Sequence, residues 1–476
     1  MMKVALGAES SRQPRKNWGT SKSIFKYTPE YKNGIIQKET MKLTIDNFAK
    51  ISHAEIELNG LTVIGGENNT GKSTVGKILY SIFRGTSDVA RRVKAERFKA
   101  VREALTNATH EQITDDDCEL VMNDVSSIRG ILEQKFAMEI GKGRHDFSSE
   151  QLDRLIRDFA DSFEPRVREN VQNALSMTRD RVEWVILQRV FNCVFHGQYH
   201  PLKADFPAAH LQLDVKNRMK SFRFHHDHAE LNSNIDLFAH AILISNPDVM
   251  SYVNIKDIDR NPAYGRILDK YVYELVIKLV KDDSRASGIL KEQRREFLEV
   301  ALAQLDEMIG GVLGPDEQGD LALRENGNVI PTKVQNLSMG VKSLLLLRTL
   351  LTRGVLSEKD VLILDEPENH LHPEWQVYYA KALVLIQKAY DLTMVVTSHS
   401  QFFVNAIQRF VISEKLVDKT EFYLSRKDER RPGYCTMDAK GKFSSDIFRS
   451  FNRAYDKISL MSGEHDDEDL DTNIRS

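Results

Sequence analysis

The sequence predicts an α/β fold in which a parallel sheet with crossover helices carries a largely helical, charged insertion. Near the start, three short segments alternate or run apolar in the manner of strands: 42–48, 52–58 and 61–66. From about residue 335 the pattern becomes helix, strand, helix, strand, helix, which is typical of parallel strands joined by crossover helices. Residues 85 to about 200, between these regions, are highly charged and mostly helical in pattern.

Composition excludes several classes of protein. Of 476 residues, 41% are hydrophobic and 28% charged, and the net charge of −3 favours neither binding nor avoidance of nucleic acid. No apolar run approaches the roughly 20 residues that span a bilayer, and the start lacks a signal-peptide core, so we expect no membrane partner. Cys118, Cys193 and Cys435 show no paired spacing. We interpret them as free thiols, which predicts a cytoplasmic protein.

A glycine-rich segment at 65–74, "GGENNTGKST", predicts a phosphate-binding loop. Gly66, Gly71, Lys72 and Ser73 satisfy the pattern G-x-x-x-x-G-K-[ST], with the apolar strand "LTVI" before it and the helix "TVGKILYSIF" after it. Glycines let such a loop turn its backbone N–H groups inward around a phosphate, and the helix N-terminus adds partial positive charge. We expect Lys72 to reach the β- and γ-phosphates and the Ser73 hydroxyl to bind Mg²⁺.

Two later strands end in residues suited to catalysis. "VLILDEPENHLHP", residues 361–373, is an apolar strand ending in Asp365 and Glu366, the place where parallel sheets bind ligands. We expect Asp365 to hold Mg²⁺ through water and Glu366 to polarise the attacking water, although such acids also occur in solvated loops. "TMVVTSHSQFF" ends its strand at Ser398-His399. His399 is a candidate to contact the γ-phosphate, and the alternative is a helix cap or surface group.

The segment "NLSMGVKSLLLL", residues 336–347, has two compatible interpretations. In one, Ser338 caps a buried, leucine-rich helix. In the other, the N–H groups and partial positive charge of this helix start face a phosphate held by a second subunit. A capping box is disfavoured, because Val341 stands where Glu or Gln would close it. The segment precedes Asp365 by one helix and one strand.

Together these motifs resemble the ATP-binding-cassette (ABC) class of ATPases. The phosphate loop, "LSMG", "LILDEPENHLHP" and "TSH" follow one another in that order. Within the class, "LTVIGGENNTGKST" after "KLTIDNFAKI", and "DEPENHLHP", are most similar to the branch that includes RecF, the SMC proteins, their DNA-break-repair relatives and OLD-family proteins. The match covers about residues 41–84 and 330–411. It implies a P-loop NTPase fold of the ABC-ATPase head type.

The resemblance also implies roles for individual residues. Asp365 is the Mg²⁺-side acid together with Ser73, Glu366 is the catalytic carboxylate and His399 is the γ-phosphate switch. Glu368, Asn369 and His370 fall in a segment that crosses a dimer interface. The residues implied to contact ATP are Gly66, Asn68, Asn69, Thr70, Gly71, Lys72, Ser73 and Thr74, with Ser338 and Gly340 of the signature capping the nucleotide of a partner subunit.

The sequence departs from the family pattern in three places. Met339 stands where the common signature has glycine, and Gln198 in "FHGQYHP" is the candidate for the glutamine near Mg²⁺. OLD-family nucleases carry a TOPRIM nuclease domain, whereas fewer than 80 residues follow His399 here and lack its strand-borne acids. This TOPRIM-less layout is similar to ATPase subunits of two-gene antiphage systems such as the Septu type, which pair with a separate effector nuclease.

Three functional hypotheses follow. The first is an ATPase that forms a homodimer or higher homo-oligomer around ATP and gates a separate effector protein. The second is a slow, nucleotide-dependent scaffold, and the third is a DNA repair or DNA-structuring ATPase. The basic helix at 91–102 is a candidate DNA surface or a charge-paired helix face. His226 and His228 would share one face of a strand, as a zinc site or as surface residues.

The domain organisation is predicted from these motifs and from composition. Residues 1–40 are polar and basic, and Met41 opens the first alternating strand, so both Met1 and Met41 are candidate start codons. We expect a flexible N-terminal extension at 1–40, an N-terminal lobe of the ATPase head at 41–84, a mainly helical insertion plus hairpin at 85–240, a C-terminal lobe at 241–460 and an acidic disordered tail at 461–476.

Overall fold

A computed structural model describes most of the chain between Met41 and Gly441. The described residues are 41–109, 111–142, 148–199, 207–216, 218–224, 229–233, 235–253, 268–280, 288–356 and 360–441. The expected N-terminal extension and acidic tail, and also His226 and His228, lie outside these residues.

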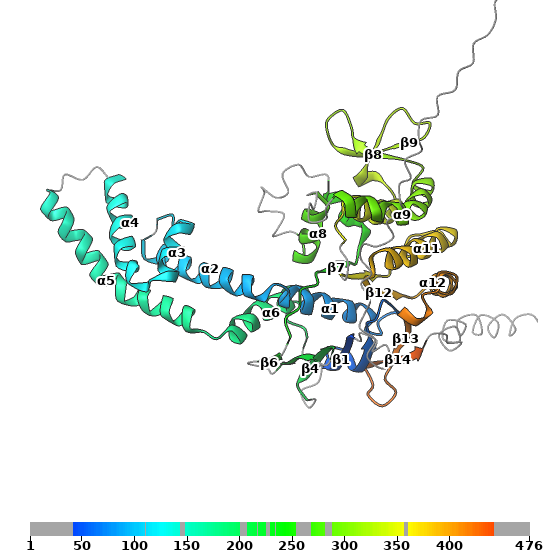
Figure 1. The fold of residues 1–476 in the computed structure, drawn as a ribbon, viewed down its shortest axis with the longest axis horizontal. Coiled ribbons are helices and arrows are strands. Elements are labelled where there is room, and N and C mark those ends of the chain that lie inside the picture. Colours follow the sequence, from blue (N-terminus) through cyan, green and yellow to red (C-terminus); the bar gives the residue numbers. More distant parts are fainter. Residues whose placement is uncertain are drawn as a thin grey trace, which may run out of the picture. The chain divides into compact units, whose positions relative to one another are not determined.

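One eleven-stranded mixed sheet organises the described chain, in the order β6-β5-β4-β1-β2-β14-β13-β3-β12-β11-β7 (Figure 1). Strands β13, β3, β12, β11 and β7 pair in parallel, whereas β6, β5, β4, β1 and β2 pair antiparallel. The strands are β1 (Met41–Phe48), β2 (Ile51–Glu57), β3 (Leu61–Gly66), β4 (Ala209–Val215), β5 (Arg218–Phe224), β6 (Ala229–Ser233), β7 (Ala241–Ile244), β11 (Val361–Asp365), β12 (Thr393–Ser398), β13 (Thr420–Lys427) and β14 (Cys435–Gly441).

The structure confirms the three early strands and the helix–strand alternation after residue 335. It also confirms an α/β fold with a largely helical, charged insertion. The hairpin strands β4 and β5, expected within the insertion, extend the main sheet, because β4 pairs with β1. No sequence motif predicted strands β13 and β14, which lie between β3 and β2 in the sheet. A separate three-stranded sheet contains β8 (Gly311–Pro315), β9 (Leu321–Glu325) and β10 (Thr332–Lys333).

Helices cover both faces of the parallel half of the sheet, and this explains why its strands are apolar throughout. On one face, α1 and α6 pack on β3, β11 and β12 through residues such as Ile64 and Ile363, and on the other face α8 to α12 cover Val63, Leu364 and Val396. The helices are α1 (Lys72–Thr86), α6 (Arg179–Phe195), α8 (Lys270–Val280), α9 (Gly288–Ile309), α10 (Met339–Thr352), α11 (Pro373–Tyr390) and α12 (Gln401–Ser413).

The helical part of the insertion has a small core of its own. Buried residues such as Val101, Cys118, Leu132 and Val171 pack together there, away from the cores of the sheet. Helices α2, α3 and α5 are amphipathic, and Thr114 and Ser148 cap two of them with complete capping boxes. The four helices are α2 (Val89–Thr109), α3 (Asp115–Asn123), α4 (Ile128–Lys142) and α5 (Ser149–Ser176).

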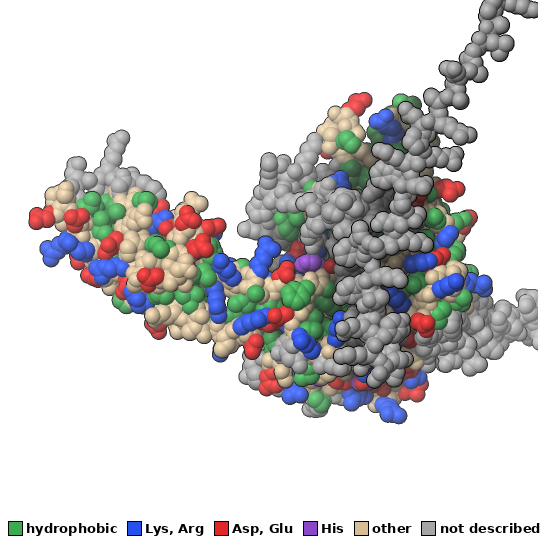
Figure 2. Space-filling model, in the orientation of Figure 1, with side chains coloured by type: hydrophobic (Ala, Val, Ile, Leu, Met, Phe, Trp, Pro, Cys, Tyr) green, Lys and Arg blue, Asp and Glu red, His purple; other side chains and the backbone are tan. Residues whose placement is uncertain are grey.

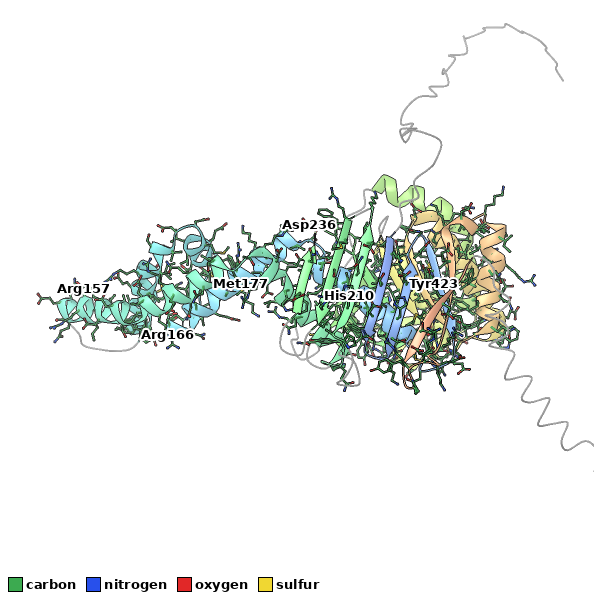
Figure 3. The ribbon with its side chains drawn as sticks, turned by 90° about the horizontal axis from the view of Figure 1, so that it is seen from below. Arg157, Arg166, Met177, His210, Asp236 and Tyr423 are labelled. Carbon is green, nitrogen blue, oxygen red and sulfur yellow. The ribbon has the colours of Figure 1, made fainter. Side chains whose placement is uncertain are left out.

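Basic and acidic side chains are interspersed over these helices (Figure 2). Figure 3 labels Arg157 and Arg166 on α5, and Met177 where α5 gives way to α6. Basic side chains of α2 are paired as follows: Lys94 with Glu119, Lys99 with Glu103, Arg102 with Asp115 and Arg97 with the carbonyl oxygen of Met177. These pairs favour the interpretation of residues 91–102 as a charge-paired helix face over that of a DNA surface.

A buried ion pair joins α6 to the antiparallel half of the sheet. The Lys220 Nζ on β5 lies 2.5 Å from the Glu183 carboxylate on α6, and the two side chains are 0% and 3% exposed. Lys220 also donates a hydrogen bond to the carbonyl oxygen of Ile235. Two buried charges are tolerated only as a pair, because either one alone would remain desolvated without compensation.

We predict that Glu183→Leu alone lowers the free energy of unfolding by about 3–5 kcal/mol, because Lys220 would be left as an uncompensated buried charge. The double variant Glu183→Leu/Lys220→Met should recover most of that loss, since both charges are then removed. Urea unfolding followed by circular dichroism measures both effects. A double variant as unstable as the single variant would contradict this account of the pair.

Candidate active site

The phosphate loop occupies the connection between β3 and α1. Its backbone has positive φ at Gly66 (150°), Asn69 (63°) and Gly71 (87°), a conformation that favours glycine and tolerates asparagine. A Cβ on Gly66 would lie 2.3 Å from the carbonyl oxygen of Ser425 on β13, so no larger residue fits there. The glycines predicted from the sequence pattern therefore have a local structural reason.

Lys72 lies inside this loop. Its side chain is 3% exposed, and its Nζ donates hydrogen bonds to the carbonyl oxygens of Gly66 (3.0 Å) and Glu67 (2.8 Å). Burial lowers the pKa of Lys72, and the nearby carboxylates, Glu366 first and then Asp365, partly offset that decrease. The ammonium group is therefore held at the centre of the loop and next to the acids of β11.

Residues outside the motif hold the loop from beneath. The Ser425 hydroxyl on β13 donates to the carbonyl oxygen of Thr70 at 2.5 Å, and the Thr70 hydroxyl donates to the carbonyl oxygen of Glu67 at 2.7 Å. On the exposed side, the Lys50 ammonium donates to the Asn69 side chain at 2.7 Å. Thr70 and Ser425 are each 1% exposed, so the bond between them forms away from competing water.

Asp365 and Glu366 lie where β11 ends, beside the end of β12. Thr397 on β12 is the register partner of Asp365, and its hydroxyl donates to an Asp365 carboxylate oxygen at 2.6 Å. The same hydroxyl oxygen accepts a hydrogen bond from the Glu366 N–H at 3.1 Å. Glu366 has φ of 49°, an uncommon conformation for a residue other than glycine.

Three polar groups surround the Glu366 carboxylate. One oxygen lies 3.6 Å from the Lys72 Nζ. The other accepts a hydrogen bond from the Asn369 side chain at 3.0 Å and lies 3.4 Å from the Nδ1 atom of His399. A carboxylate held between a lysine and a histidine at the end of a parallel strand is placed to polarise a water molecule.

Glu368 is almost fully buried at 2% exposure, although the sequence placed it in a segment expected to cross a dimer interface. One of its carboxylate oxygens accepts hydrogen bonds from the Ser398 hydroxyl (2.5 Å) and from the N–H groups of His399 (3.2 Å) and Ser400 (3.3 Å). Burial raises the pKa of Glu368, whereas these hydrogen bonds and the charge of His399 act in the opposite direction. The net shift of this pKa is upward, because burial has the largest effect.

His399 is 41% exposed and opens onto a cleft of about 400 Å³. The cleft is also lined by Asn369, His370 and Phe402, and Phe402 is 61% exposed. Candidate catalytic groups therefore border a surface that a second molecule can reach, in contrast to the enclosed Lys72.

The signature segment starts α10, as expected. Ser338 is the exposed N-cap residue, and its hydroxyl accepts a hydrogen bond from the Val341 N–H at 3.3 Å. Gly340 is buried. A Cβ at this position would lie 2.8 Å from the carbonyl oxygen of His370, so a larger residue would not fit. Among the described residues, no hydrogen bond or ion pair joins Ser338 to the phosphate loop of its own chain.

The residues present fit a bound Mg²⁺ ion of the kind that accompanies ATP. Within the described ranges, no group of three or more His, Cys, Asp or Glu side chains could hold a metal ion by itself. Mg²⁺ at phosphate sites keeps several waters and takes one or two protein oxygens together with phosphate oxygens. Ser73, in the first turn of α1, and Asp365 supply such oxygens.

Gln198 lies after the end of α6 and is exposed, and its neighbour Tyr199 accepts a hydrogen bond from the Ala49 N–H between β1 and β2. Its role near Mg²⁺ stays a prediction.

Ser245 follows β7, the parallel neighbour of β11, and its hydroxyl donates to the Tyr271 hydroxyl at 3.4 Å. Ser245 and Tyr271 border a cavity of about 270 Å³.

The sequence matches a known protein family. The family described as "AAA ATPase domain" matches residues 41–404, more than three quarters of the chain. The chain belongs to this AAA ATPase domain family. ATP binding and hydrolysis are therefore its activities at the level of the family, and the α/β fold with a phosphate loop is that of a P-loop NTPase. None of the curated proteins compared matches the sequence.

Several solved structures resemble the chain. The SMC head domain from Thermotoga maritima is 12% identical with a TM-score of 0.36, covering 84% of this chain and 98% of that one. An Smc head domain from Pyrococcus furiosus, bound to the C-terminal domain of ScpA, is 11% identical with a TM-score of 0.36, covering 89% and 99%. An ATP-binding cassette of an ABC transporter is 11% identical with a TM-score of 0.29, covering 81% and 87%.

We found no described helix that combines the length and the apolar composition needed to cross a membrane.

We predict that Thr397→Val raises the Mg²⁺ concentration needed for half-maximal ATP hydrolysis by about 10- to 100-fold, because the Asp365 carboxylate loses the hydroxyl that orients it. The substitution keeps the shape of the side chain. Titration of steady-state ATPase activity with MgCl₂ at saturating ATP measures the change.

Thr420→Val is the matched control, since Thr420 is equally buried on β13 but donates to the carbonyl oxygen of Leu416. Its Mg²⁺ dependence should equal that of the unchanged protein. An equal shift in both variants would mean that Thr397 has no specific connection to the metal site.

Proposed function

We propose that the chain binds ATP with Mg²⁺ and hydrolyses it in a site that a second copy completes. The observation that carries this proposal is the convergence of Lys72, Asp365, Glu366 and His399, which come from three separate motifs, around one end of the parallel sheet. Four side chains of these types have a shared purpose in phosphoryl transfer and none in packing.

The residues would divide the reaction as follows. The loop N–H groups and Lys72 would bind the β- and γ-phosphates. Ser73 and Asp365 would hold Mg²⁺, which would supply positive charge to the phosphates. Glu366 orients water for attack on the γ-phosphorus while the bond to the ADP oxygen breaks, and it accepts the proton that the water loses. His399, which lies beside the same carboxylate, contacts the γ-phosphate.

The second copy would contribute its signature. Ser338 is exposed at the start of α10, where the first N–H groups of the helix and its partial positive charge lie. A γ-phosphate bound by one copy would satisfy these groups on the other. ATP would therefore join two copies, in a homodimer or a higher homo-oligomer, and hydrolysis would release them.

The helical insertion is the proposed contact surface for a separate effector protein. It exposes large apolar side chains on three of its helices, and a partner protein could cover them. They are Leu120 on α3, Met138 on α4, and Leu155 and Phe163 on α5. The nucleotide state would gate this partner, as in TOPRIM-less antiphage systems with a separate nuclease.

Two alternatives make different predictions. A slow nucleotide-dependent scaffold would bind the same partner with negligible turnover. A DNA repair or DNA-structuring ATPase would show turnover stimulated by DNA with a steep dependence on salt. The pairing of basic side chains on α2 with acids weighs against the latter.

We predict that Glu366→Gln reduces kcat by at least about 100-fold while ATP still binds, because the amide cannot accept the proton from water. The same variant should accumulate as an ATP-dependent dimer or larger species, since hydrolysis no longer separates the copies. Steady-state ATPase assays and light scattering with ATP measure the two effects. Normal hydrolysis by this variant would refute the assignment of Glu366.

The control for the larger species is the double variant Glu366→Gln/Ser338→Arg. The arginine would obstruct the partner's phosphate at the signature while leaving the chain's own loop unchanged. It should bind ATP and remain monomeric. A double variant that still assembles with ATP would show that the signature is not part of the interface.

We predict that a neighbouring-gene product co-purifies with the chain and is lost on Lys72→Ala, because the apo state would not present the insertion correctly. The pair Met138→Ser/Phe163→Ser should also lose it, with ATPase activity retained. Val312→Ser, which changes an exposed apolar side chain on β8, outside the insertion, is the control. Capture that survives both Lys72→Ala and the insertion pair would contradict the gating proposal.

A further inference from the structure

We propose that Glu368 and Asn369 form a clamp that sets the position of His399 against Glu366. The clamp is defined by these two side chains, which are adjacent in sequence but bind opposite members of the catalytic pair. This inference rests on the proposed function and deepens it, because it assigns positioning residues to the same reaction. Neither residue touches the phosphate loop through a hydrogen bond in the described part of the chain.

Asn369 forms the first arm of the clamp. Its side-chain amide donates to the Glu366 carboxylate oxygen at 3.0 Å, and its backbone N–H donates to the Glu366 carbonyl oxygen at 3.1 Å. Two bonds from one residue therefore close the turn after β11 and orient the carboxylate. The positive φ of Glu366 makes this restraint necessary, since that backbone conformation is unfavourable by itself.

Glu368 forms the second arm. One carboxylate oxygen accepts three hydrogen bonds from consecutive residues, the Ser398 hydroxyl and the N–H groups of His399 and Ser400. These bonds fix the backbone from which the His399 imidazole extends. The imidazole Nδ1 then lies 3.4 Å from the Glu366 oxygen that Asn369 already holds.

Burial of a carboxyl group here has a structural cost that packing alone does not explain. Glu368 is 2% exposed, and its second carboxylate oxygen is buried without a hydrogen-bond partner. An apolar residue would avoid the desolvation penalty of that oxygen. It would, however, leave the His399 N–H without its acceptor, while the Ser400 N–H would keep only its bond to the Ser398 hydroxyl at 3.0 Å. The position therefore requires an oxygen acceptor more than it requires a charge.

A further pair of bonds ties the same segment to α11. The Ser400 hydroxyl donates to the Gln376 side-chain oxygen at 2.7 Å, and the Gln376 amide donates to the carbonyl oxygen of Leu371 at 3.1 Å. Gln376 on α11 thus connects Ser400, which follows His399, to Leu371, which follows the two clamp residues. His399 can therefore move relative to Glu366 only if several of these bonds break together.

The decisive experiment compares Glu368→Ala, Asn369→Ala and His399→Ala by ATPase kinetics and by ATP affinity. Glu368→Ala should reduce kcat by roughly 100-fold, because a catalytic group displaced by about 1 Å loses that much. Asn369→Ala should change kcat in the same direction. Dissociation constants for ATP, measured without turnover, should stay within about twofold, since the clamp does not contact the triphosphate. Unchanged kcat in Glu368→Ala would overturn the proposal.

A double-mutant cycle tests whether Glu368 acts through His399. If it does, Glu368→Ala/His399→Ala should be no slower than His399→Ala, because the second change removes nothing further. Multiplied losses would mean that Glu368 acts independently, and the proposal would fail.

Rescue separates positioning from charge. Glu368→Gln keeps an oxygen at the acceptor position, so its kcat should lie within about threefold of the unchanged protein. A Glu368→Gln variant as slow as Glu368→Ala would contradict the proposal. Should Glu368→Ala not fold, Ser398→Ala removes one of the three donors and should reduce kcat by a smaller factor with ATP affinity retained, and no reduction would count against the clamp.

Two controls make the result interpretable. Glu183→Leu also removes a buried carboxylate, but on α6, and it should leave kcat per folded molecule unchanged. Wild-type turnover and its loss in Glu366→Gln are measured in the same series. Absence of wild-type turnover refutes the proposed function, whereas wild-type turnover with a fully active Glu368→Ala variant refutes only the clamp.

Discussion

The parallel pairing of β12 with β3 on one side and with β11 on the other is the constraint on which the site depends. Register places Asp365 opposite Thr397 and Ser398 opposite Gly65, so the phosphate loop, the acids and the histidine begin at one edge of the sheet. Parallel strands can share an edge in this way only when long crossovers return the chain to the opposite end. Helices α11 and α12 begin near this edge, after β11 and β12, and carry the chain back to the opposite end of the sheet.

The sequence predicted those parts of the site that follow an apolar strand within a few residues. Lys72, Glu366 and His399 were identified because each closes a short-range pattern, and the structure brings all three together. The role of Thr397 was not predicted, because it depends on the register of Thr397 with Asp365. The register of two parallel strands cannot be predicted from the sequence of either strand alone.

Two other features lay beyond sequence reasoning for different physical reasons. Ser425 supports the phosphate loop from 355 residues away, and no local pattern links such positions. Glu368 belongs to a segment that resemblance places at an interface, but its side chain is buried in its own chain. Resemblance identifies a segment, whereas the direction of each side chain depends on the turn, here one with positive φ at Glu366 and His370. The same turn places the carbonyl oxygen of His370 against Gly340, so the signature segment contacts the residue that follows the clamp.

The place of β13 in the sheet has a consequence for how the protein is made. Strand β3 is completed early in synthesis, yet both of its neighbours, β12 and β13, emerge only after the insertion. Until then the edges of β3 have unpaired N–H and C=O groups, and contacts so distant in sequence form slowly. The nascent chain therefore carries an open sheet edge next to its glycine-rich loop for most of translation. Chaperone binding during that interval would protect this edge from pairing with other chains.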